Sequence, residues 1–296
     1  MNNIVVIGSC NIDLTVLANK RPKAGETILG EGLNTSPGGK GANQAVAAAK
    51  LGAHVTMVGC IGQDTYGDMM LKNLKQYGID TTYLVRRDTV PTGTAHITLA
   101  EGDNSIIVIL GANATVDEAV VDNAWPAIAK ADLVLLQNEI PLATIGYAIT
   151  RCADANIPVL LNPAPAASLN SAWLDKVTYL TPNEHELSAL YPGVSQEEVL
   201  RTVKPQLLIT LGKHGVGYNN KGTLAIVPGF TVTPVDTTGA GDTFNGAFAA
   251  AIVRGETMEQ AIRYGNAAAA LSIQKLGAQE GMPFEDEVAT FMKEAH

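Results

Sequence analysis

The stretch "DTTGAGDTFNGAF", residues 236–248, places three small residues directly before an acidic one at the start of a predicted helix. Gly239, Ala240 and Gly241 would leave unobstructed backbone N–H groups at the helix N-terminus, which favours an anion. Asp242 lies in the same first turn. An anion hole beside a carboxylate base fits phosphoryl transfer to an alcohol, because the hole stabilises charge on the phosphoryl group while the base accepts the hydroxyl proton. The alternative is that Asp242 is only a favourable helix-start residue.

A second glycine-rich stretch, "PGGKGANQAVAAAKLG" at residues 37–52, also leads into a predicted helix. A P-loop is excluded, because Lys40 is followed by glycine rather than by serine or threonine. The glycines would let backbone amides approach a ligand closely, and Lys40 and Asn43 would add donors at the helix start. A plain glycine-rich helix entry without a ligand is the alternative interpretation.

Polar residues follow the first predicted strand, in "GSCNIDLT". Asn11 and Asp13 come after the carboxyl end of that strand, where ligands bind in open α/β sheets. Their spacing of two puts both side chains on one face, and an amide with a carboxylate suits sugar hydroxyls, which both donate and accept. Both residue types are also common turn formers, so the pair alone proves little.

Two later stretches have both a structural and a ligand-binding interpretation. In "TPNEHEL", Asn183 and Glu186 have the spacing of a helix capping box, which is the favoured interpretation, although Glu186 could also hold a water-coordinated magnesium ion. In "ITLGKHGVGY", Thr210, Gly212 and Gly215 end a predicted buried strand. A tight turn explains both glycines without a ligand, and neither interpretation is preferred here.

The elements that position these residues follow an alternating pattern of short β-branched runs and alanine-rich helices, which is typical of a largely parallel sheet. The clearest predicted strands are residues 4–8, 54–59, 133–137, 158–162 and 207–212, and the clearest helices are residues 41–51 and 64–77. Segments 12–32 and 94–110 instead carry alternating, half-polar strand patterns without a helix, the second with a turn at "EGDN". We expect them to form a separate small sheet.

Composition limits the partners and the compartment. The 296 residues are 46% hydrophobic and 17% charged, with 20 basic and 29 acidic residues and a formal charge of -9, so a folded α/β protein is expected and nucleic acid is not. Three widely spaced cysteines argue against a disulfide framework. The N-terminus lacks the pattern of a signal peptide, and no apolar helical stretch approaches the roughly 20 residues that span a bilayer. We expect a cytoplasmic protein with no membrane partner.

Taken together and in this order, these motifs resemble the ribokinase family of carbohydrate kinases, also called the PfkB family. "GGKGANQAVAAAKLG" is similar to its first signature and "DTTGAGDTFNGA" to its second, with "GCIGQDTYG" between them, and the likeness runs from Ile4 to about Phe284. The resemblance implies a single α/β kinase domain over residues 1–296. This would be a three-layer α/β/α fold with a mainly parallel central sheet and a small β-sheet lid from about 12–36 and 91–110.

The resemblance further implies ATP-dependent phosphorylation of D-ribose at O5, with Asp242 as base and Gly239, Ala240 and Gly241 as anion hole. The sugar would be bound by Asn11, Asp13, Gly39, Lys40, Asn43, Glu139 and Asp242, and ATP by Asn183, Thr210, Gly212, Gly215, Gly241 and Asn266. Glu186 would help to hold magnesium through water. A monovalent cation, normally potassium, would be held near Asp236, Thr238, Ser272, Lys275, Gly277 and Gly281.

Two positions depart from the family pattern. Gly281 stands where serine, whose oxygen would be a ligand, is common, so weaker cation retention is expected; Asn266 stands where some relatives have histidine, so the adenine contact could differ. The lid would pair with the lid of a second subunit in a homodimer. The alternatives are a related sugar kinase, such as a deoxyribokinase or fructokinase, a nucleoside kinase, and a catalytically silent sugar-binding or nucleotide-binding protein.

Overall fold

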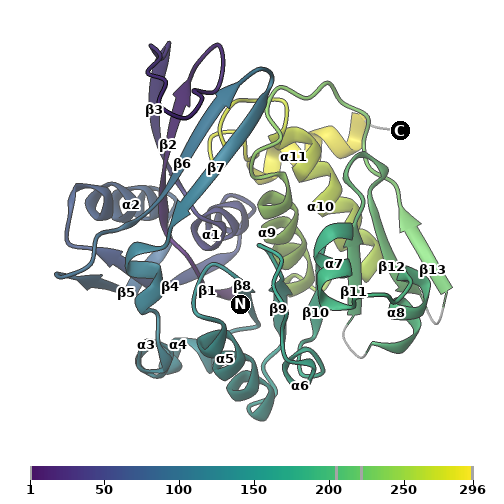
Figure 1. The fold of residues 1–296 in the computed structure, drawn as a ribbon. Helices are drawn as coiled ribbons and strands as arrows, with labels where there is room; N and C mark the ends of the chain where they lie inside the picture. Colours follow the sequence, from purple (N-terminus) through teal and green to yellow (C-terminus); the bar gives the residue numbers. More distant parts are fainter. Residues whose placement is uncertain (1, 204–205, 221–222, 295–296) are drawn as a thin grey trace.

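A large, mostly parallel sheet forms the centre of the computed structural model, which describes residues 2–203, 206–220 and 223–294 (Figure 1). Its strand order is β13-β12-β11-β10-β9-β8-β1-β4-β5, and its described strands are parallel except for β12, which runs antiparallel to both of its neighbours, β11 and β13. The strands are β1 (Asn3–Ile7), β4 (His54–Gly62), β5 (Asp80–Arg87), β8 (Leu133–Gln137), β9 (Val159–Asn162), β10 (Tyr179–Leu180), β11 (Gln206–Thr210), β12 (Val216–Asn220) and β13 (Thr223–Val227). The expected mainly parallel sheet is therefore confirmed.

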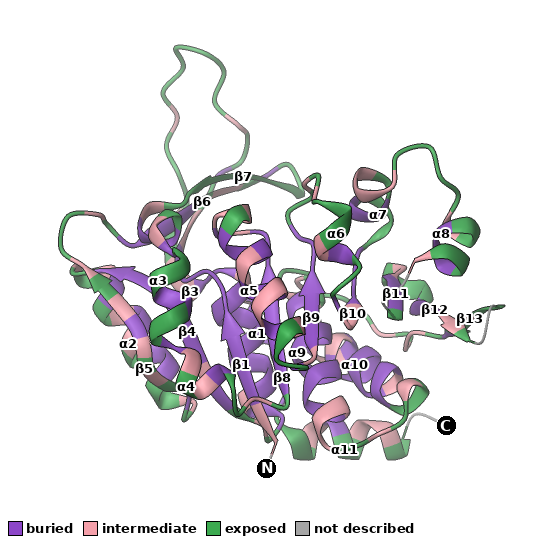
Figure 2. Ribbon diagram, turned by 90° about the horizontal axis from the view of Figure 1, so that it is seen from below, coloured by how far each residue is buried: buried purple, intermediate pink, exposed green. Residues whose placement is uncertain are grey.

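Helices cover both faces of this sheet, as Figure 2 shows. One layer contains α1 (Lys40–Lys50), α2 (Thr65–Gln76), α9 (Ala240–Val253), α10 (Met258–Ser272) and α11 (Glu285–Glu294). The other contains α3 (Glu118–Asn123), α4 (Trp125–Ile128), α5 (Leu142–Asp154), α6 (Ser171–Leu174), α7 (Glu184–Leu190) and α8 (Gln196–Thr202). Two short 3₁₀ helices, η1 (Gly111–Thr115) and η2 (Gly212–His214), complete the set. Strands buried on both faces explain the continuous apolar runs in the sequence, such as that of β8.

The predicted elements lie where the sequence pattern placed them. All five predicted strands belong to the central sheet, with ends shifted by up to three residues, and both predicted helices form with ends shifted by one residue. Gly52 and Gly78, which follow α1 and α2, have positive φ angles of 87° and 71°, the left-handed conformation expected of a residue that ends a helix.

Helices α1 and α9 lie in backbone contact. A Cβ atom at Gly246 of α9 would lie 2.5 Å from the Cβ of Ala47 and 2.8 Å from the carbonyl oxygen of Gln44, both on α1. Only a residue without a side chain fits at that spacing. The contact therefore fixes the start of α9 beside the first turns of α1.

The small sheet has the order β3-β2-β6-β7 and rises from the carboxyl end of β1. Its strands are β2 (Asn11–Leu17), β3 (Gly32–Gly38), β6 (Gly93–Ala100) and β7 (Asp103–Ile109). The turn at "EGDN" forms as expected, with positive φ at Glu101 (58°) and Gly102 (76°). The strand expected across residues 12–32 stops at Leu17, because residues 18–31 carry the strand breakers Pro22 and Gly25 and form no strand.

All three cysteines, Cys10, Cys60 and Cys152, are buried and unpaired, in agreement with the absence of a disulfide framework. Among residues 2–203, 206–220 and 223–294, no helix combines the length and the apolar character needed to cross a membrane.

Candidate active site

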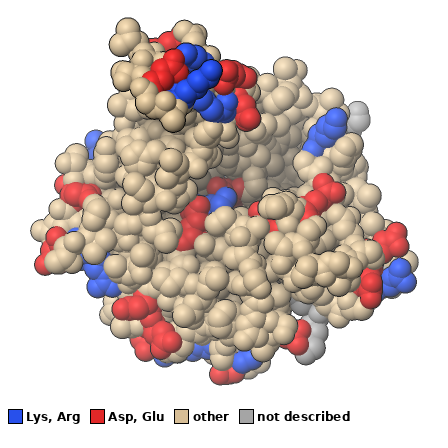
Figure 3. All heavy atoms as spheres, viewed as in Figure 1, with Lys and Arg blue, Asp and Glu red and all other residues tan. Residues whose placement is uncertain are grey.

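The candidate site lies at the carboxyl ends of β1, β8 and β9, under the small sheet. β1 lies between β4 and β8. The strands β4 and β5 are added on one side of β1 and the strands from β8 onward on the other, and open α/β sheets bind ligands where the strand order reverses in this way. Figure 3 shows that the surface is hollowed here, with acidic and basic side chains on the floor of the hollow.

Asp242 is a buried carboxylate whose two oxygens are both held by amides of α1. Asn43 Nδ2 donates to Asp242 Oδ2 at 3.0 Å, and Gln44 Nε2 donates to Asp242 Oδ1 at 3.0 Å. The side chain is 7% exposed. A carboxylate oxygen accepts more than one hydrogen bond, so Asp242 keeps lone pairs for a substrate hydroxyl while the amides fix its orientation.

The start of α9 has the form expected of an anion site. Gly239 precedes the helix in the left-handed conformation, with φ 77°. Within the part of the chain that the structure describes, the N–H groups of Gly241 and Asp242 have no acceptor. The N–H of Ala240 donates to Thr237 O at 3.3 Å, so this amide is already in use. Of the three positions expected to form the anion hole, Gly239 and Gly241 therefore have an N–H without an acceptor among the described residues, and Asp242 has another.

The start of α1 differs, because a carboxylate of the chain itself occupies it. Glu139 Oε2, just beyond β8, accepts from the N–H of Lys40 at 2.9 Å and from Ser9 Oγ at 2.6 Å. The glycines of this stretch are also required by packing: a Cβ at Gly41 would lie 2.5 Å from Ser9 N, and one at Gly39, where φ is 87°, would lie 2.8 Å from Asn11 N. The approach of a ligand to the backbone of these glycines stays a prediction.

The residues expected to bind sugar gather around Lys40. Its pKa is raised by Asp242 most of all, against the opposing effect of burial, and further by Glu139, Glu186 and Asp13. Burial, followed by the nearby charges of Glu139, Asp242 and Glu280, raises the pKa of Asp13 to about 7, while Lys40 partly offsets this. One ammonium group therefore lies among several carboxylates, which favour its charged form.

Asn11 is held from the opposite side of the hollow. It is 2% exposed, and its Oδ1 accepts from Asn113 Nδ2 at 2.7 Å. Asn113, in turn, accepts from the N–H of Cys10 at 2.8 Å. This leaves the amide N–H groups of Asn11 as the groups that can meet a hydroxyl.

The residues expected to bind ATP lie farther along the same edge of the sheet. Asn183 and Glu186 form the capping box of α7: Asn183 Oδ1 accepts from Glu186 N at 2.8 Å, and Glu186 Oε2 accepts from Asn183 N at 2.9 Å. The structural interpretation of this pair is thus confirmed. The carboxylate still acts on Lys40 across the hollow, so a capping role and a position at the site coexist.

Two other parts of the expected ATP site, the turn after β11 and the side chain of Asn266, also have structural roles. Gly212 and Gly215 form a tight turn with positive φ angles of 56° and 94°, and the turn starts beyond Thr210 at the end of β11. Asn266 uses its Nδ2 to donate to Val227 O and Pro228 O, each at 3.1 Å. The structure places Asn266 under the loop after β13, where it holds backbone and offers only Oδ1 to a ligand.

The expected cation residues meet in one loop region beside α9. Asp236 Oδ1 accepts from Thr238 N and Oδ2 from Gly277 N, both at 2.9 Å. Burial opposes ionisation of Asp236, but hydrogen bonds from Thr238 and Gly277 together hold the pKa of its carboxyl below the usual value. Ser272 ends α10, and its carbonyl oxygen accepts from Lys275 N at 3.4 Å; Gly277 O accepts from Gly281 N at 3.0 Å.

Sequence reasoning singled out Asn43 but missed Gln44 and Gln279, the other amides of the hydrogen-bond network around Asp242. Gln44 is fully buried; besides holding Asp242, it accepts from Gln137 Nε2 at 2.7 Å and donates to Asn162 Oδ1 at 3.1 Å. A glutamine inside an alanine-rich helix, and amides that end β8 and β9, were the available signals. Gln279, which donates to Asn43 Oδ1 at 2.9 Å, lies too far along the chain for any spacing rule.

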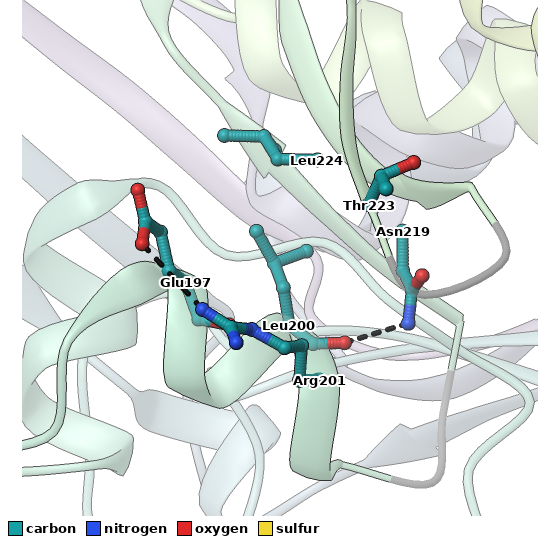
Figure 4. Close-up of a pocket in the computed structure, with 6 residues that line it drawn as sticks. All are labelled: Glu197, Leu200, Arg201, Asn219, Thr223 and Leu224. Carbon is teal, nitrogen blue, oxygen red and sulfur yellow. Dashed lines mark hydrogen bonds and ion pairs between the residues drawn. The ribbon is translucent and has the colours of Figure 1, made fainter.

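A separate hollow of about 340 Å³ lies between α8 and the β12–β13 hairpin (Figure 4). Its lining residues are Glu197, Leu200, Arg201, Asn219, Thr223 and Leu224. Asn219 Nδ2 donates to Leu200 O at 2.6 Å across it. None of the candidate site residues lines this hollow, so it is not part of the site.

Comparison with known proteins identifies the class. Residues 1–285 match the sequence model of the pfkB family of carbohydrate kinases, and the chain belongs to this family. It is similar to ribokinase of Bacillus subtilis, with 53% identity over 288 residues, 97% of this chain and 98% of that protein.

Two solved structures are also close to this chain. Ribokinase from Thermotoga maritima has 40% identity and a TM-score of 0.91, over 99% of this chain and 100% of that one. Arabidopsis thaliana ribokinase complexed with ribose and ATP has 35% identity and a TM-score of 0.90, over 99% of each chain. The fold and the family expected from the motifs are therefore confirmed.

We predict that Asp13→Asn stabilises the protein at pH 8 and weakens sugar binding. With a pKa of about 7 in the fold against 3.8 without it, Asp13 retains a proton that the unfolded chain releases, so its contribution to the free energy of unfolding falls as pH rises between these values. Asparagine removes this cost. Urea unfolding should show the variant more stable than wild type at pH 8 and the difference shrinking toward pH 4; a variant less stable at pH 8 would contradict the assignment.

Proposed function

We propose that this protein transfers the γ-phosphoryl group of ATP to O5 of D-ribose, giving D-ribose 5-phosphate and ADP. The observation that carries the proposal is the position of Asp242, a carboxylate fixed by Asn43 and Gln44 at the start of a helix. Among the described residues, the backbone N–H groups of positions 241 and 242 there have no acceptor. A base and an anion hole side by side serve group transfer, whereas binding alone needs no base.

In this mechanism the sugar lies over β1 and β8, with its hydroxyls paired to Asn11, Asp13 and Asn43. The O5–H proton passes to Asp242 as O5 bonds to the γ-phosphorus, and the bond from that phosphorus to the bridging oxygen of ADP breaks. The amides at the start of α9 stabilise charge on the phosphoryl oxygens as they move. Lys40, whose pKa is raised, keeps its positive charge and offsets the surrounding carboxylates and phosphates.

D-ribose is favoured as acceptor by the polar character of the site and by the relative from Bacillus subtilis, a ribokinase that is 53% identical to this chain. Asn11 and Asp13 converge without an aromatic platform of the kind that would suit a nucleoside base. A deoxyribokinase would differ by the recognition of a single hydroxyl, and a fructokinase by the shape of the acceptor. A silent binding protein, the alternative of a different class, would need no base beside the anion site.

An assay of ADP release with ribose, 2-deoxyribose, fructose and adenosine tests this proposal. Ribose should give the highest kcat/KM, because a site built around a hydroxyl leaves its own polar groups unpaired when that hydroxyl is missing, a mismatch worth up to roughly 10⁴-fold in favourable cases. Equal kcat/KM for ribose and 2-deoxyribose would remove the claim of ribose specificity. Ribose binding without any ADP release would favour the silent binding protein.

ATP would lie along the ends of β10 and β11, by Asn183, Thr210, the turn of Gly212 and Gly215, and Asn266. Magnesium bound with ATP would neutralise phosphate charge, and oxygen ligands such as the Glu186 carboxylate suit it. Glu186 is 8% exposed and its oxygens already accept from Asn183, so it would reach the ion through water rather than directly.

The loop around Asp236 fits a potassium ion in its donor set, which consists of a carboxylate and backbone carbonyls. Gly281 is crowded by these carbonyls: a Cβ there would lie 2.5 Å from Ser272 O and 2.9 Å from Gly277 O. A serine at this position would need the loop to shift before it could add a ligand. We propose that potassium binds here. Its oxygen ligands would come from side chains or backbone carbonyls of the following residues: Asp236, Thr238, Ser272, Lys275, Gly277 and Gly281.

Potassium should raise both the activity and the thermal stability of the protein. Exchange of potassium for tetramethylammonium, which is too large for an oxygen cage, should lower kcat and the unfolding midpoint, and Asp236→Asn should weaken both responses. If rate and midpoint stay constant through the exchange, no potassium site of this kind exists.

The small sheet is proposed to serve as a lid that pairs with the lid of a second copy. Its edge strand β7 is exposed throughout, and the four apolar residues Ile106, Ile107, Val108 and Ile109 are between 44% and 69% exposed. An exposed apolar edge invites strand pairing or aggregation unless a partner covers it.

The free, buried cysteines and the use of ATP fit a cytoplasmic location.

Sedimentation should show wild type as a dimer and Ile107→Lys as a monomer. Ile226→Lys is the matched control, because Ile226 is an isoleucine 54% exposed on β13, the edge strand of the central sheet. The control should remain dimeric. A monomeric wild type, or a dimer that survives Ile107→Lys, would contradict the proposed interface.

A further inference from the structure

A chain of side-chain amides runs from α2 to the carboxylate of Asp242. Gln76 Nε2 donates to Asn73 Oδ1 at 3.0 Å, and Asn73 Nδ2 donates to Gln279 Oε1 at 2.7 Å. Gln279 Nε2 donates to Asn43 Oδ1 at 2.9 Å, and Asn43 Nδ2 donates to Asp242 Oδ2 at 3.0 Å. Every amide thus donates in the same direction, toward Asp242.

The carboxylate sets this direction. Asp242 can only accept, so Asn43 must turn its N–H toward it and its oxygen toward Gln279. Gln279 must then present N–H to Asn43 and its oxygen to Asn73, which presents N–H in its turn. Each amide has one orientation that satisfies both neighbours, and such chains strengthen cooperatively in a buried setting.

The links of the chain are closed to water except at its start. Asn73, Gln279 and Asn43 are 9%, 2% and 6% exposed, whereas Gln76 lies at the surface. Lys50 fixes the backbone that carries Gln279, because its Nζ donates to Gln279 O and Met282 O, each at 2.8 Å. If a buried donor of this series of amides is removed, no water molecule can reach the site to replace its hydrogen bond.

We infer that Gln279 and Asn73 are positioning residues for phosphoryl transfer: they lock the amide of Asn43 in the orientation that holds the base Asp242. Neither residue touches Asp242 itself. Because Asn43 Oδ1 is committed to Gln279 and one N–H to Asp242, a single N–H of Asn43 remains for the sugar. The inference rests on the proposed role of Asp242 as base.

The test compares two substitutions at Gln279 with a matched control. Gln279→Met keeps the length of the side chain but removes the donor, and Gln279→Glu places an acceptor where the donor was, which draws the N–H of Asn43 away from Asp242. Gln274→Met is the control, because Gln274 is exposed in the turn just after α10, and the hydrogen bond of its side chain goes to Ala270 O in the last turn of that helix. All are measured as purified full-length protein with ribose and ATP.

We expect kcat to fall about tenfold in Gln279→Met, the loss associated with one loosened hydrogen bond to a charged group, with KM for ATP unchanged. Gln279→Glu should lose more, about 100-fold, and Gln274→Met should match wild type. Asn73→Leu should resemble Gln279→Met, which keeps the test open if the glutamate variant does not fold.

Folded Gln279→Met and Asn73→Leu proteins with kcat within twofold of the control would overturn the inference, as would a rise in KM without a fall in kcat. Measuring wild type in the same assay distinguishes a failure of the positioning role of Gln279 from a failure of the proposed ribose kinase activity. If wild type fails on ribose but phosphorylates another sugar, the proposed acceptor is wrong, and the kcat ratios measured on that sugar decide the role of Gln279.

Discussion

The backbone contact between α1 and α9 at Gly246 is the constraint on which the site depends. It brings Asp242, one turn before Gly246 on α9, next to Asn43 and Gln44 near the start of α1. A larger residue at position 246 would separate the helices and with them the base from the amides that orient it. The apolar core on this face of the sheet therefore determines the geometry of a polar site at its edge.

Two glycine-rich helix starts lie side by side, and the chain uses them differently. At α1 the helix N-terminus is satisfied internally by Glu139, so this helix is fixed to the turn after β1 and to the end of β8. At α9 the N–H of Ala240 is used within the turn, but the N–H groups of Gly241 and Asp242 have no acceptor among the described residues. One helix is thus a rigid support, and the other offers its N-terminus to an anion. Near these helix starts, burial first and then the neighbouring carboxylates raise the pKa of Asp13, and Lys40 offsets only part of this effect.

Sequence reasoning could predict elements that a local pattern determines. The buried strands β1 and β8, the glycine-ended helices α1 and α2, and the capping box of Asn183 and Glu186 all follow from residues close in sequence. The parallel sheet followed from their alternation, and the family from two long motifs. Asp242 itself could be singled out because an aspartate that only starts a helix does not call for Gly-Ala-Gly before it.

What could not be predicted depends on contacts between distant residues. Gln279 and Asn43 are 236 positions apart, and nothing local to either marks the hydrogen bond between them. Gln44 points to the same carboxylate as its neighbour Asn43, although adjacent helical residues ordinarily face different directions. The packing reason for the glycines of the first motif was also hidden, because the backbone of residues 9–11, which a side chain at Gly39 or Gly41 would meet, lies about 30 positions earlier in the chain.

The central claim is that Asp242 accepts the proton of the sugar hydroxyl, and Asp242→Asn tests it most directly. Asparagine keeps the size of the side chain and the neighbouring amides but removes the basicity. Ribose and ATP binding, measured by calorimetry, should change little, while kcat for ribose should fall by at least about two orders of magnitude, as expected for loss of a general base. A variant that phosphorylates ribose at a rate near that of wild type would show that Asp242 is only a helix-start residue and would contradict the mechanism.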